Sequence, residues 1–306
     1  MQEFSSAVLE FIRAHVPEED ILENEPMSRH TTFRVGGKAA CFIKISNTEQ
    51  LKRLIPYFKA VEIPYFILGN GSNLLVGDHG YDGVILQLKE KFNRIETEGS
   101  LLRAQAGALL SQAAQCALEH SLAGFAFASG IPGTVGGGVM MNAGAYGGEM
   151  KQVVEEVTVL DENGEVLVLD NETMEFGYRT SIIKNRHFTV LEVTFRLKEG
   201  NREEIRREMD ELSAKRREKQ PLNFPSAGST FKRPEGYFAG KLIMDAGLRG
   251  YSIGGAAVSE KHCGFVINKG NATAADVSEV IAEVQERVKD KFGVTLECEV
   301  IRLGNF

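Results

Sequence analysis

Cysteine is scarce in this chain. There are four cysteines among 306 residues, none belongs to a CxxC pair, and no histidines cluster beside them. Zinc sites and disulfide frameworks both need several such residues at short spacings, so we predict no metal site. We interpret Cys41, Cys116, Cys263 and Cys298 as reduced core residues of a cytosolic protein.

An excess of positive charge and the common nucleotide-binding motifs are also lacking. Lys and Arg number 35 against 42 Asp and Glu, and this balance argues against nucleic acid and membrane surfaces as partners. There is no G-x-G-x-x-G and no G-x-x-x-x-G-K-[ST], which excludes the Rossmann and P-loop folds, and no G-x-S-x-G of a hydrolase. An anionic ligand must therefore be bound by a local site of another kind.

No segment has the pattern of a signal peptide or a membrane helix. The first twenty residues lack a basic start and a cleavage site, and they predict an amphipathic helix. Residues 121–148 are uncharged and long enough to cross a bilayer, but they include nine glycines and Pro132. Each glycine costs a helix about 1 kcal/mol, so we predict a buried loop, and long loops usually carry function.

Alternating helix and strand patterns predict an α+β fold in three parts. Further helices are expected at residues 48–60, 109–120, 201–220 and 273–292, the last opened by a capping box from Thr273 to Asp276. Extended segments are expected at residues 31–45, 65–68, 84–88, 153–160, 165–169, 189–197 and 295–303, with a two-residue hairpin turn at Asn163 and Gly164. The expected parts are residues 1–62, a mixed sheet domain at 63–200, and a third domain at 201–306 that begins with a charge-dense helix.

Three glycine-rich segments are candidates for ligand binding. Residues 67–75 follow a strand, and their small side chains expose successive backbone N–H groups that can hold a phosphate; the alternative is an ordinary tight turn. Residues 129–147 are costly to order unless a bulky ligand packs on them, and the alternative of a disordered linker is disfavoured by their apolar residues. Residues 225–232 surround Ser229, which by itself is no more than a serine in a turn.

Seven motifs together carry a resemblance to a known family. In order and spacing, the chain resembles the UDP-N-acetylenolpyruvoylglucosamine reductases at residues 24–33, 68–76, 129–137, 141–145, 177–181, 227–232 and 253–257. The resemblance extends from about residue 20 to the C-terminus. It implies a two-part FAD-binding region of the vanillyl-alcohol-oxidase type, followed by a C-terminal α+β domain that binds the substrate.

The resemblance also implies the reaction. In this family NADPH reduces a non-covalent FAD, which then reduces UDP-N-acetylglucosamine enolpyruvate to UDP-N-acetylmuramate for bacterial peptidoglycan synthesis in the cytoplasm. The residues expected to bind FAD are Gly69, Asn70, Gly71, Ser72, Asn73, Leu74, Ser129, Gly130, Ile131, Pro132, Gly133, Thr134, Gly136, Gly137, Asn142 and Gly144. An oxidase on the same scaffold and a catalytically silent binding protein remain as alternatives.

The family's catalytic groups match Arg179, Ser229 and Glu299. Without the resemblance, these residues are equally a loop arginine, a turn serine and an exposed acid on an alternating strand. Hydride addition to an enol ether conjugated with a carboxylate places negative charge on the carboxylate side. A fixed guanidinium and a protonated carboxyl stabilise such charge, which supports the assignment.

The substrate contacts are matched less closely. Lys219 resembles the family's lysine for the sugar-nucleotide phosphate, but it is equally the exposed end of a charged helix. Arg233 and His262 occupy substrate-side positions at which some members carry Asn and Gln, and Ile301 stands where some carry Arg. Only 50 residues separate Arg179 from Ser229, which leaves little room for the long insertion of one family type and indicates the shorter type with a more open substrate cleft.

Overall fold

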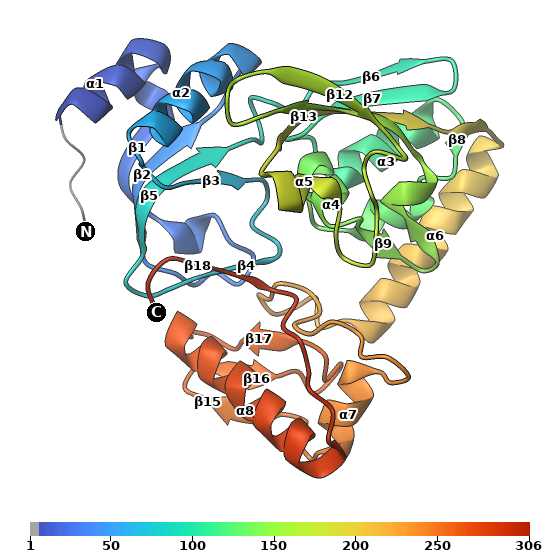
Figure 1. Cartoon of the computed structure of the whole chain (residues 1–306). Coiled ribbons are helices and arrows are strands. Elements are labelled where there is room, and N and C mark those ends of the chain that lie inside the picture. Colours follow the sequence, from blue (N-terminus) through green and yellow to red (C-terminus); the bar gives the residue numbers. More distant parts are fainter. Residues whose placement is uncertain (1–5) are drawn as a thin grey trace.

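A four-stranded sheet organises the N-terminal unit of the computed structural model, which describes residues 6–306 (Figure 1). Its strands run in the spatial order β1 (Ile21–Pro26), β2 (Lys38–Lys44), β5 (Tyr81–Gln87) and β3 (Tyr65–Leu68). Helices α1 (Ser6–His15) and α2 (Thr48–Ala60) pack against each other beside this sheet. This sheet extends past the expected boundary at residue 62, because β5 pairs with β2 and β3 pairs with β5.

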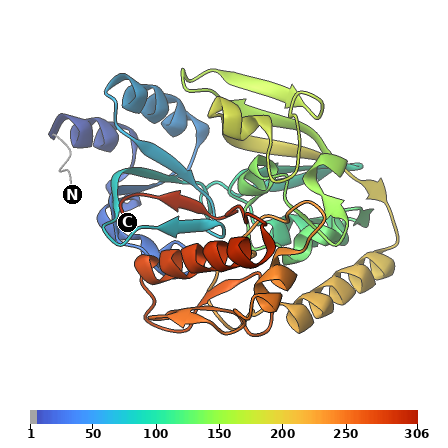
Figure 2. The same cartoon turned by 60° about the horizontal axis from the view of Figure 1, so that its bottom comes forward.

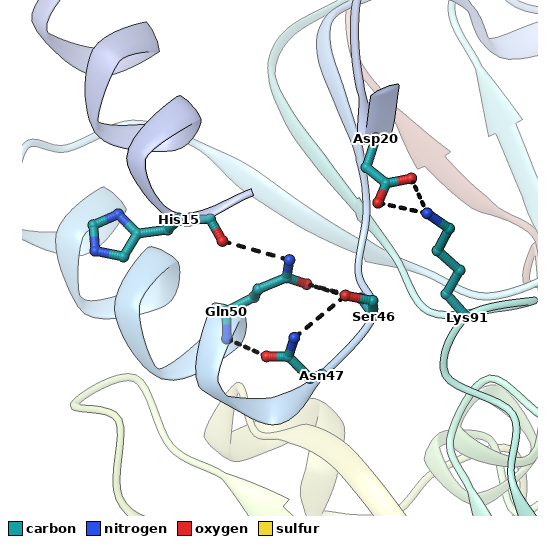
Figure 3. A network of polar contacts seen from close by, with 6 residues as sticks. All are labelled: His15, Asp20, Ser46, Asn47, Gln50 and Lys91. Atoms are coloured by element: carbon teal, nitrogen blue, oxygen red, sulfur yellow. Dashed lines mark hydrogen bonds and ion pairs between the residues drawn. The ribbon is translucent and has the colours of Figure 1, made fainter. Parts of the chain in front are cut away.

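Polar contacts join the N-terminal segment to α2 and to the loop after β5 (Figure 3). Asn47 caps α2 by accepting a hydrogen bond from the Gln50 backbone N–H at 3.0 Å, and the Gln50 side chain donates to the carbonyl oxygen of His15 at 3.5 Å. The buried carboxylate of Asp20 accepts from Lys91 Nζ at 2.6 and 2.7 Å. The predicted N-terminal helix is confirmed for residues 6–15, which form α1, and residues 1–5 lie outside the described residues.

A five-stranded antiparallel sheet forms the second unit. Its spatial order is β12 (Val166–Asp170), β11 (Val154–Leu160), β13 (Thr189–Arg196), β7 (Leu101–Gln105) and β6 (Ile95–Glu98). The unit's helices are α3 (Leu110–Glu119), α4 (Val135–Met140), α5 (Ile182–Arg186) and the 3₁₀ segment η3 (Ala126–Gly130). The long helix α6 (Arg202–Lys219) packs against η3 and α3, so the expected boundary at residue 201 separates α6 from the unit that it covers.

The third unit combines a small sheet with two helices. Strands β15 (Ser252–Ile253), β16 (Ala256–Val258) and β17 (Val266–Asn268) pair in that order, and α7 (Ala239–Asp245) and α8 (Ala274–Phe292) pack against each other. The predicted capping box is confirmed, because Thr273 Oγ1 accepts from the Asp276 N–H and Asp276 Oδ2 accepts from the Thr273 N–H, both at 3.0 Å. The buried valines of α8 belong to the core of the unit.

The chain ends by returning to the N-terminal unit. Strand β18 (Ile301–Leu303) pairs in parallel with β4 (Leu74–Val76), as Figures 1 and 2 show. The expected strand at residues 295–303 is therefore too long. Its first part is a connection between units that is tied to the third unit by a bridge between Cys298 and Phe231. This connection brings residues just before β18 to the junction of all three units.

Three further expectations need correction. Residues 31–33 form a bend and a turn and residues 34–37 are irregular, so they are not part of a strand, and Arg34 has a φ of +56°. The hairpin between β11 and β12 has a three-residue loop, closed by a hydrogen bond from the Asp161 N–H to the Glu165 carbonyl oxygen, with only Gly164 left-handed. Residues 135–140 are helical despite their three glycines. The helix packs so closely on its neighbours that a Cβ at Gly136 would lie 2.9 Å from Ala106 Cβ, and this close packing stabilises it.

The remaining elements are short. They are η1 (Glu18–Asp20), η2 (Met27–Arg29), β8 (Leu122–Ala123), β9 (Gly144–Ala145), β10 (Gly148–Glu149), η4 (Met150–Gln152) and β14 (Lys198–Glu199). The four cysteines carry free thiols, two of them buried and two, Cys116 and Cys298, half-buried. Over the part of the chain described here, no helix is both long and apolar enough to span a bilayer.

Candidate active site

Two clefts meet where the three units come together. The first, here called the central cleft, has a volume of about 280 Å³ and is lined by the glycine-rich segments of the first two units and by residues 227–229. The second, the outer cleft, has a volume of about 420 Å³ and lies on the third unit. Arg179, Ser229 and Glu299 line both clefts, so they form the wall between them.

The loop between β3 and β4 forms one side of the central cleft. Gly71 has a φ of +62°, and a Cβ there would collide with the carbonyl oxygen of His30. Such a backbone turns its N–H groups outward. In the described part of the chain, the N–H groups of Asn70, Gly71 and Ser72 donate to no protein acceptor. The Asn70 side chain ties the loop to the opposite wall by donating to the Pro132 carbonyl oxygen at 2.7 Å.

Residues 131–134 form the facing side. A Cβ at Gly69 would collide with Thr134 Oγ1, so the two loops lie in direct contact. Thr134 also caps α4 by accepting from the Gly137 N–H at 3.4 Å. Within residues 6–306, the N–H groups of Gly133 and Thr134 have no protein acceptor. The two loops therefore present a shared set of N–H donors at a helix N-terminus, which suits a phosphate group.

Most of the predicted cofactor residues line the central cleft. They are Gly69, Asn70, Gly71, Ser72, Asn73, Leu74, Ile131, Pro132, Gly133, Thr134, Gly137 and Gly144. Ser129, Gly130, Gly136 and Asn142 do not line it. Both hydrogens of Asn142 Nδ2 are used within the protein, by the Glu149 carboxylate and the Gly177 carbonyl oxygen. The expected contact of Asn142 with a cofactor stays a prediction, and these two hydrogens have no part in it.

Arg179 and Glu299 form an ion pair across the wall. Arg179 Nε lies 2.8 Å from Glu299 Oε1, and the two side chains are 25% and 13% exposed. The N–H of Nε does not point along this line, and Arg179 Nε is a buried donor without a hydrogen bond. Burial raises the pKa of Glu299, while the Arg179 guanidinium opposes this effect less strongly. Glu299 is thus held closer to its protonated form than an exposed glutamate.

Ser229 projects from the third unit into the same junction. It is exposed between the buried residues Ala227 and Thr230, and Gly228 before it has a φ of +74°. The Thr230 carbonyl oxygen accepts from the Glu299 N–H at 2.8 Å, which fixes the backbone of the serine loop against that of the acid. Ser229 is therefore an accessible hydroxyl on a fixed backbone.

The outer cleft contains two of the three predicted substrate residues. Arg233 stacks over the Phe238 ring at 4.0 Å, and His262 accepts from the Gly264 N–H at 3.1 Å through Nδ1. Burial lowers the pKa of His262, so its neutral form is favoured. Lys219 lies exposed in the last turn of α6 and lines neither cleft.

Sequence reasoning missed two residues of the central cleft. Arg216 and Gln220 lie one helical turn apart at the end of α6, and Arg216 Nη1 donates to the Gly130 carbonyl oxygen. Gln220 Oε1 is, with Arg179 Nε, one of two buried side-chain polar atoms among the described residues that lack a partner. Both atoms belong to residues that line the central cleft, which is typical of a site completed by a ligand. Because α6 contains many charged and polar residues, its sequence pattern does not distinguish Arg216 and Gln220 from the others.

Comparisons with known proteins agree with this geometry. Residues 39–170 match the model of an FAD binding domain, and residues 220–303 match that of the C-terminal domain of UDP-N-acetylenolpyruvoylglucosamine reductase. A UDP-N-acetylenolpyruvoylglucosamine reductase of Caldanaerobacter subterraneus subsp. tengcongensis is 56% identical, with 92% of this chain and 93% of the relative covered. One from Clostridium perfringens is 54% identical, with 94% of both chains covered. The chain belongs to the UDP-N-acetylenolpyruvoylglucosamine reductase family.

A solved structure supports the same membership. The crystal structure of UDP-N-acetylenolpyruvylglucosamine reductase (MurB) from Thermus caldophilus matches with a TM-score of 0.79 and 37% identity, over 92% of this chain and 98% of that one. A glucose dehydrogenase, Phl p 4.0202, matches with a TM-score of 0.50 at 10% identity over 64% of this chain and 45% of that one, which concerns the fold alone. This member of the reductase family is an FAD-dependent oxidoreductase, and its predicted α+β fold is confirmed.

Proposed function

We propose that this protein catalyses the NADPH-dependent, FAD-mediated reduction of UDP-N-acetylglucosamine enolpyruvate to UDP-N-acetylmuramate, for peptidoglycan synthesis in a bacterial cytoplasm. The observation that carries the proposal is the shared wall of Arg179, Ser229 and Glu299 between the two clefts. A cofactor in the central cleft and a substrate in the outer cleft would meet at these three side chains. Family membership supplies the substrate class.

The residues of the central cleft fit FAD. The unpartnered N–H groups of Asn70, Gly71, Ser72, Gly133 and Thr134 suit a pyrophosphate and need no lysine, which agrees with the acidic composition of the chain. When bound, FAD supplies the hydride that it accepts from NADPH. The unpartnered atoms of Arg179 and Gln220 lie at the same cleft and are the further groups that a bound cofactor or substrate would satisfy.

The three wall residues have separate roles in the proposed reaction. Arg179 holds the substrate carboxylate and stabilises the negative charge that develops there, and the Glu299 carboxyl supports this charge in its protonated form. Ser229 donates a proton to the carbon beside the ether oxygen after hydride has reached the other alkene carbon. These roles need an arginine, an acid and a hydroxyl within one wall, and the structure brings them from three segments far apart in sequence.

The outer cleft is proposed to bind the sugar nucleotide. Its lining includes Arg233, Lys241, Arg249 and Lys261, whose positive charges suit a diphosphate, together with His262. The predicted role of Lys219 stays a prediction, since its side chain lies outside both clefts. The short connection between Arg179 and Ser229 supports the open form of the cleft.

Anaerobic mixing distinguishes this proposal from its alternatives. NADPH should bleach the absorbance of the bound flavin, and later addition of UDP-N-acetylglucosamine enolpyruvate should restore it. An oxidase would respond to oxygen but not to the sugar nucleotide, and a binding protein would not be bleached by NADPH. Either of these outcomes would contradict the proposed function.

We expect the bound FAD to be non-covalent. Covalent tethers on this scaffold use His or Cys, and no residue identified in the lining of the central cleft is either one. Denaturation with acid or heat should therefore release all yellow colour into the supernatant. Yellow colour that remains on the precipitated protein would show that a tether exists.

The substrate half-reaction should depend on the ionisation of Glu299. Burial raises the pKa of this carboxyl from its ordinary value of 4.5, and the protonated fraction falls as the pH rises through the raised pKa. We expect the rate of flavin reoxidation by substrate to fall over the same range, and Glu299→Gln to lose this part of the profile. Stopped-flow rates across pH test this, with reduction by NADPH as the control. An unchanged profile in Glu299→Gln would assign the titration to another group.

A further inference from the structure

Arg179 is held in a tight turn with an unfavourable backbone. The turn is closed by hydrogen bonds from the Gly177 N–H to the Thr180 carbonyl oxygen at 3.1 Å and from the Thr180 N–H to the Gly177 carbonyl oxygen at 3.4 Å. Arg179 has a φ of +57°, a left-handed conformation in which the Cβ atom crowds the backbone. A residue of this kind keeps such a conformation only when the surrounding contacts impose it.

Two side-chain hydrogen bonds anchor this turn, one at each end. Before the turn, the Gly177 carbonyl oxygen accepts from Asn142 Nδ2 at 3.1 Å. After the turn, Ser181 Oγ donates to the Met140 carbonyl oxygen at 3.0 Å. Ser181 is fully buried and Asn142 is 2% exposed, so water does not replace either bond. Both anchors lead to the same short segment, residues 140–142, beside the central cleft.

The anchoring segment is itself fixed. Asn142 Oδ1 accepts from the Lys151 N–H at 2.9 Å, and its Nδ2 also donates to Glu149 Oε2 at 3.2 Å. The Asn142 N–H donates to the Val139 carbonyl oxygen at 3.1 Å, which ties the segment to the end of α4. Asn142 has a φ of +41°, and asparagine tolerates this region better than most residues. The turn is therefore attached to a rigid part of the second unit.

We propose that Asn142 and Ser181 are positioning residues for Arg179. They hold the two ends of its turn so that the guanidinium reaches across the wall to Glu299, 2.8 Å away. Neither side chain lines the central or the outer cleft, so both act through Arg179 and not by touching the reactants. This inference rests on the proposed role of Arg179 in the substrate half-reaction.

Two variants each break one anchor. Ser181→Ala removes the hydroxyl donor. Asn142→Asp removes both Nδ2 hydrogen bonds, to Gly177 and to Glu149, but keeps the Oδ1 acceptor for Lys151. Small displacements of catalytic groups lower rates strongly, and we expect flavin reoxidation by UDP-N-acetylglucosamine enolpyruvate to slow by about tenfold or more in each variant.

Two other measurements should not change. Reduction by NADPH and the FAD dissociation constant, measured by flavin fluorescence on the apoprotein, should each stay within about twofold of the parent, because neither depends on Arg179 in this proposal. Ser278→Ala is the matched control, since Ser278 Oγ also donates to a backbone carbonyl oxygen, that of Ala274 at 2.8 Å, but in the distant helix α8. A general loss of folding would slow both half-reactions and raise the FAD dissociation constant, and this outcome would overturn the proposal.

A double-mutant cycle separates positioning from a direct role. If Ser181 acts through Arg179, then Ser181→Ala should have no further effect on the substrate half-reaction in the Arg179→Ala background. A full and additive loss in that background would overturn the inference. The inference would also be overturned if the substrate half-reaction were slow in Arg179→Ala but ran at the parental rate in both Ser181→Ala and Asn142→Asp, and the proposed function would then stay intact. A parental rate of this half-reaction in Arg179→Ala would instead contradict the proposed function itself.

Discussion

Ser229→Ala is expected to bind FAD and to accept hydride from NADPH at the parental rate, but to be reoxidised by UDP-N-acetylglucosamine enolpyruvate at least about a hundredfold more slowly. The reason is chemical. After hydride addition, the carbon beside the ether oxygen needs a proton, and a positioned donor contributes roughly 10²–10⁴-fold in rate. Ser229 is the exposed hydroxyl in the wall between the clefts, on a backbone that Thr230 fixes against Glu299.

Stopped-flow measurement of the two half-reactions separately tests this expectation. Ser229→Cys should recover part of the lost rate, because a thiol also donates a proton. Equal slowing of both halves in Ser229→Ala would indicate a damaged flavin site, and an unaffected second half would remove Ser229 from the mechanism. The serine is in a loop with room on one side, since nothing lies within 4 Å of a Cβ placed at Gly228.

Arg179→Ala should produce the second large defect, about 10²–10³-fold in the substrate half-reaction, which is the usual effect of removing one donor from a charge-stabilising site. Its guanidinium lies in the wall at 2.8 Å from Glu299, with a buried Nε–H that has no hydrogen bond in the protein. A substrate carboxylate would satisfy this donor. Removal of the arginine also leaves Glu299 without its cation, which favours the protonated acid still further.

Arg179→Lys provides the sharper comparison. Lysine keeps the charge but loses the planar fork that binds a carboxylate through two parallel hydrogen bonds, so this variant should also be impaired. Reduction by NADPH is the internal control for both variants and should be nearly unchanged. Parental turnover of the enolpyruvyl substrate by Arg179→Ala would show that the proposed role is wrong.

Much of the local structure follows from the sequence alone. The helix that opens at Thr273 and the helix over residues 48–60 are where their caps and apolar spacing predict them, because both signals depend on neighbours within one or two turns. Glycine-rich segments that the sequence marks as candidates for ligand binding line the central cleft, since small residues with free N–H groups are a local property of the backbone.

Other features depend on contacts between distant segments. The sheet of the N-terminal unit crosses residue 62, and α6 covers the second unit, because strand pairing and helix packing join residues that the local pattern does not relate. The helix at residues 135–140 forms against its glycine content because packing against Ala106 and Leu110 outweighs propensity. Asn142 lies in a motif that predicts contact with a cofactor, yet its side-chain Nδ2 donates both of its hydrogens to other residues of the protein.

The motifs of the chain are enough to indicate the reductase family and to single out Arg179, Ser229 and Glu299 as candidates. That these three residues share one wall follows from the packing of the three units against one another. The parallel pairing of β18 with β4 returns the end of the chain to the first unit, and this return carries Glu299 from the third unit to the turn that holds Arg179. An edge strand can pair with any exposed edge of suitable length, so its partner is set by the packing of whole units and not by its own residues.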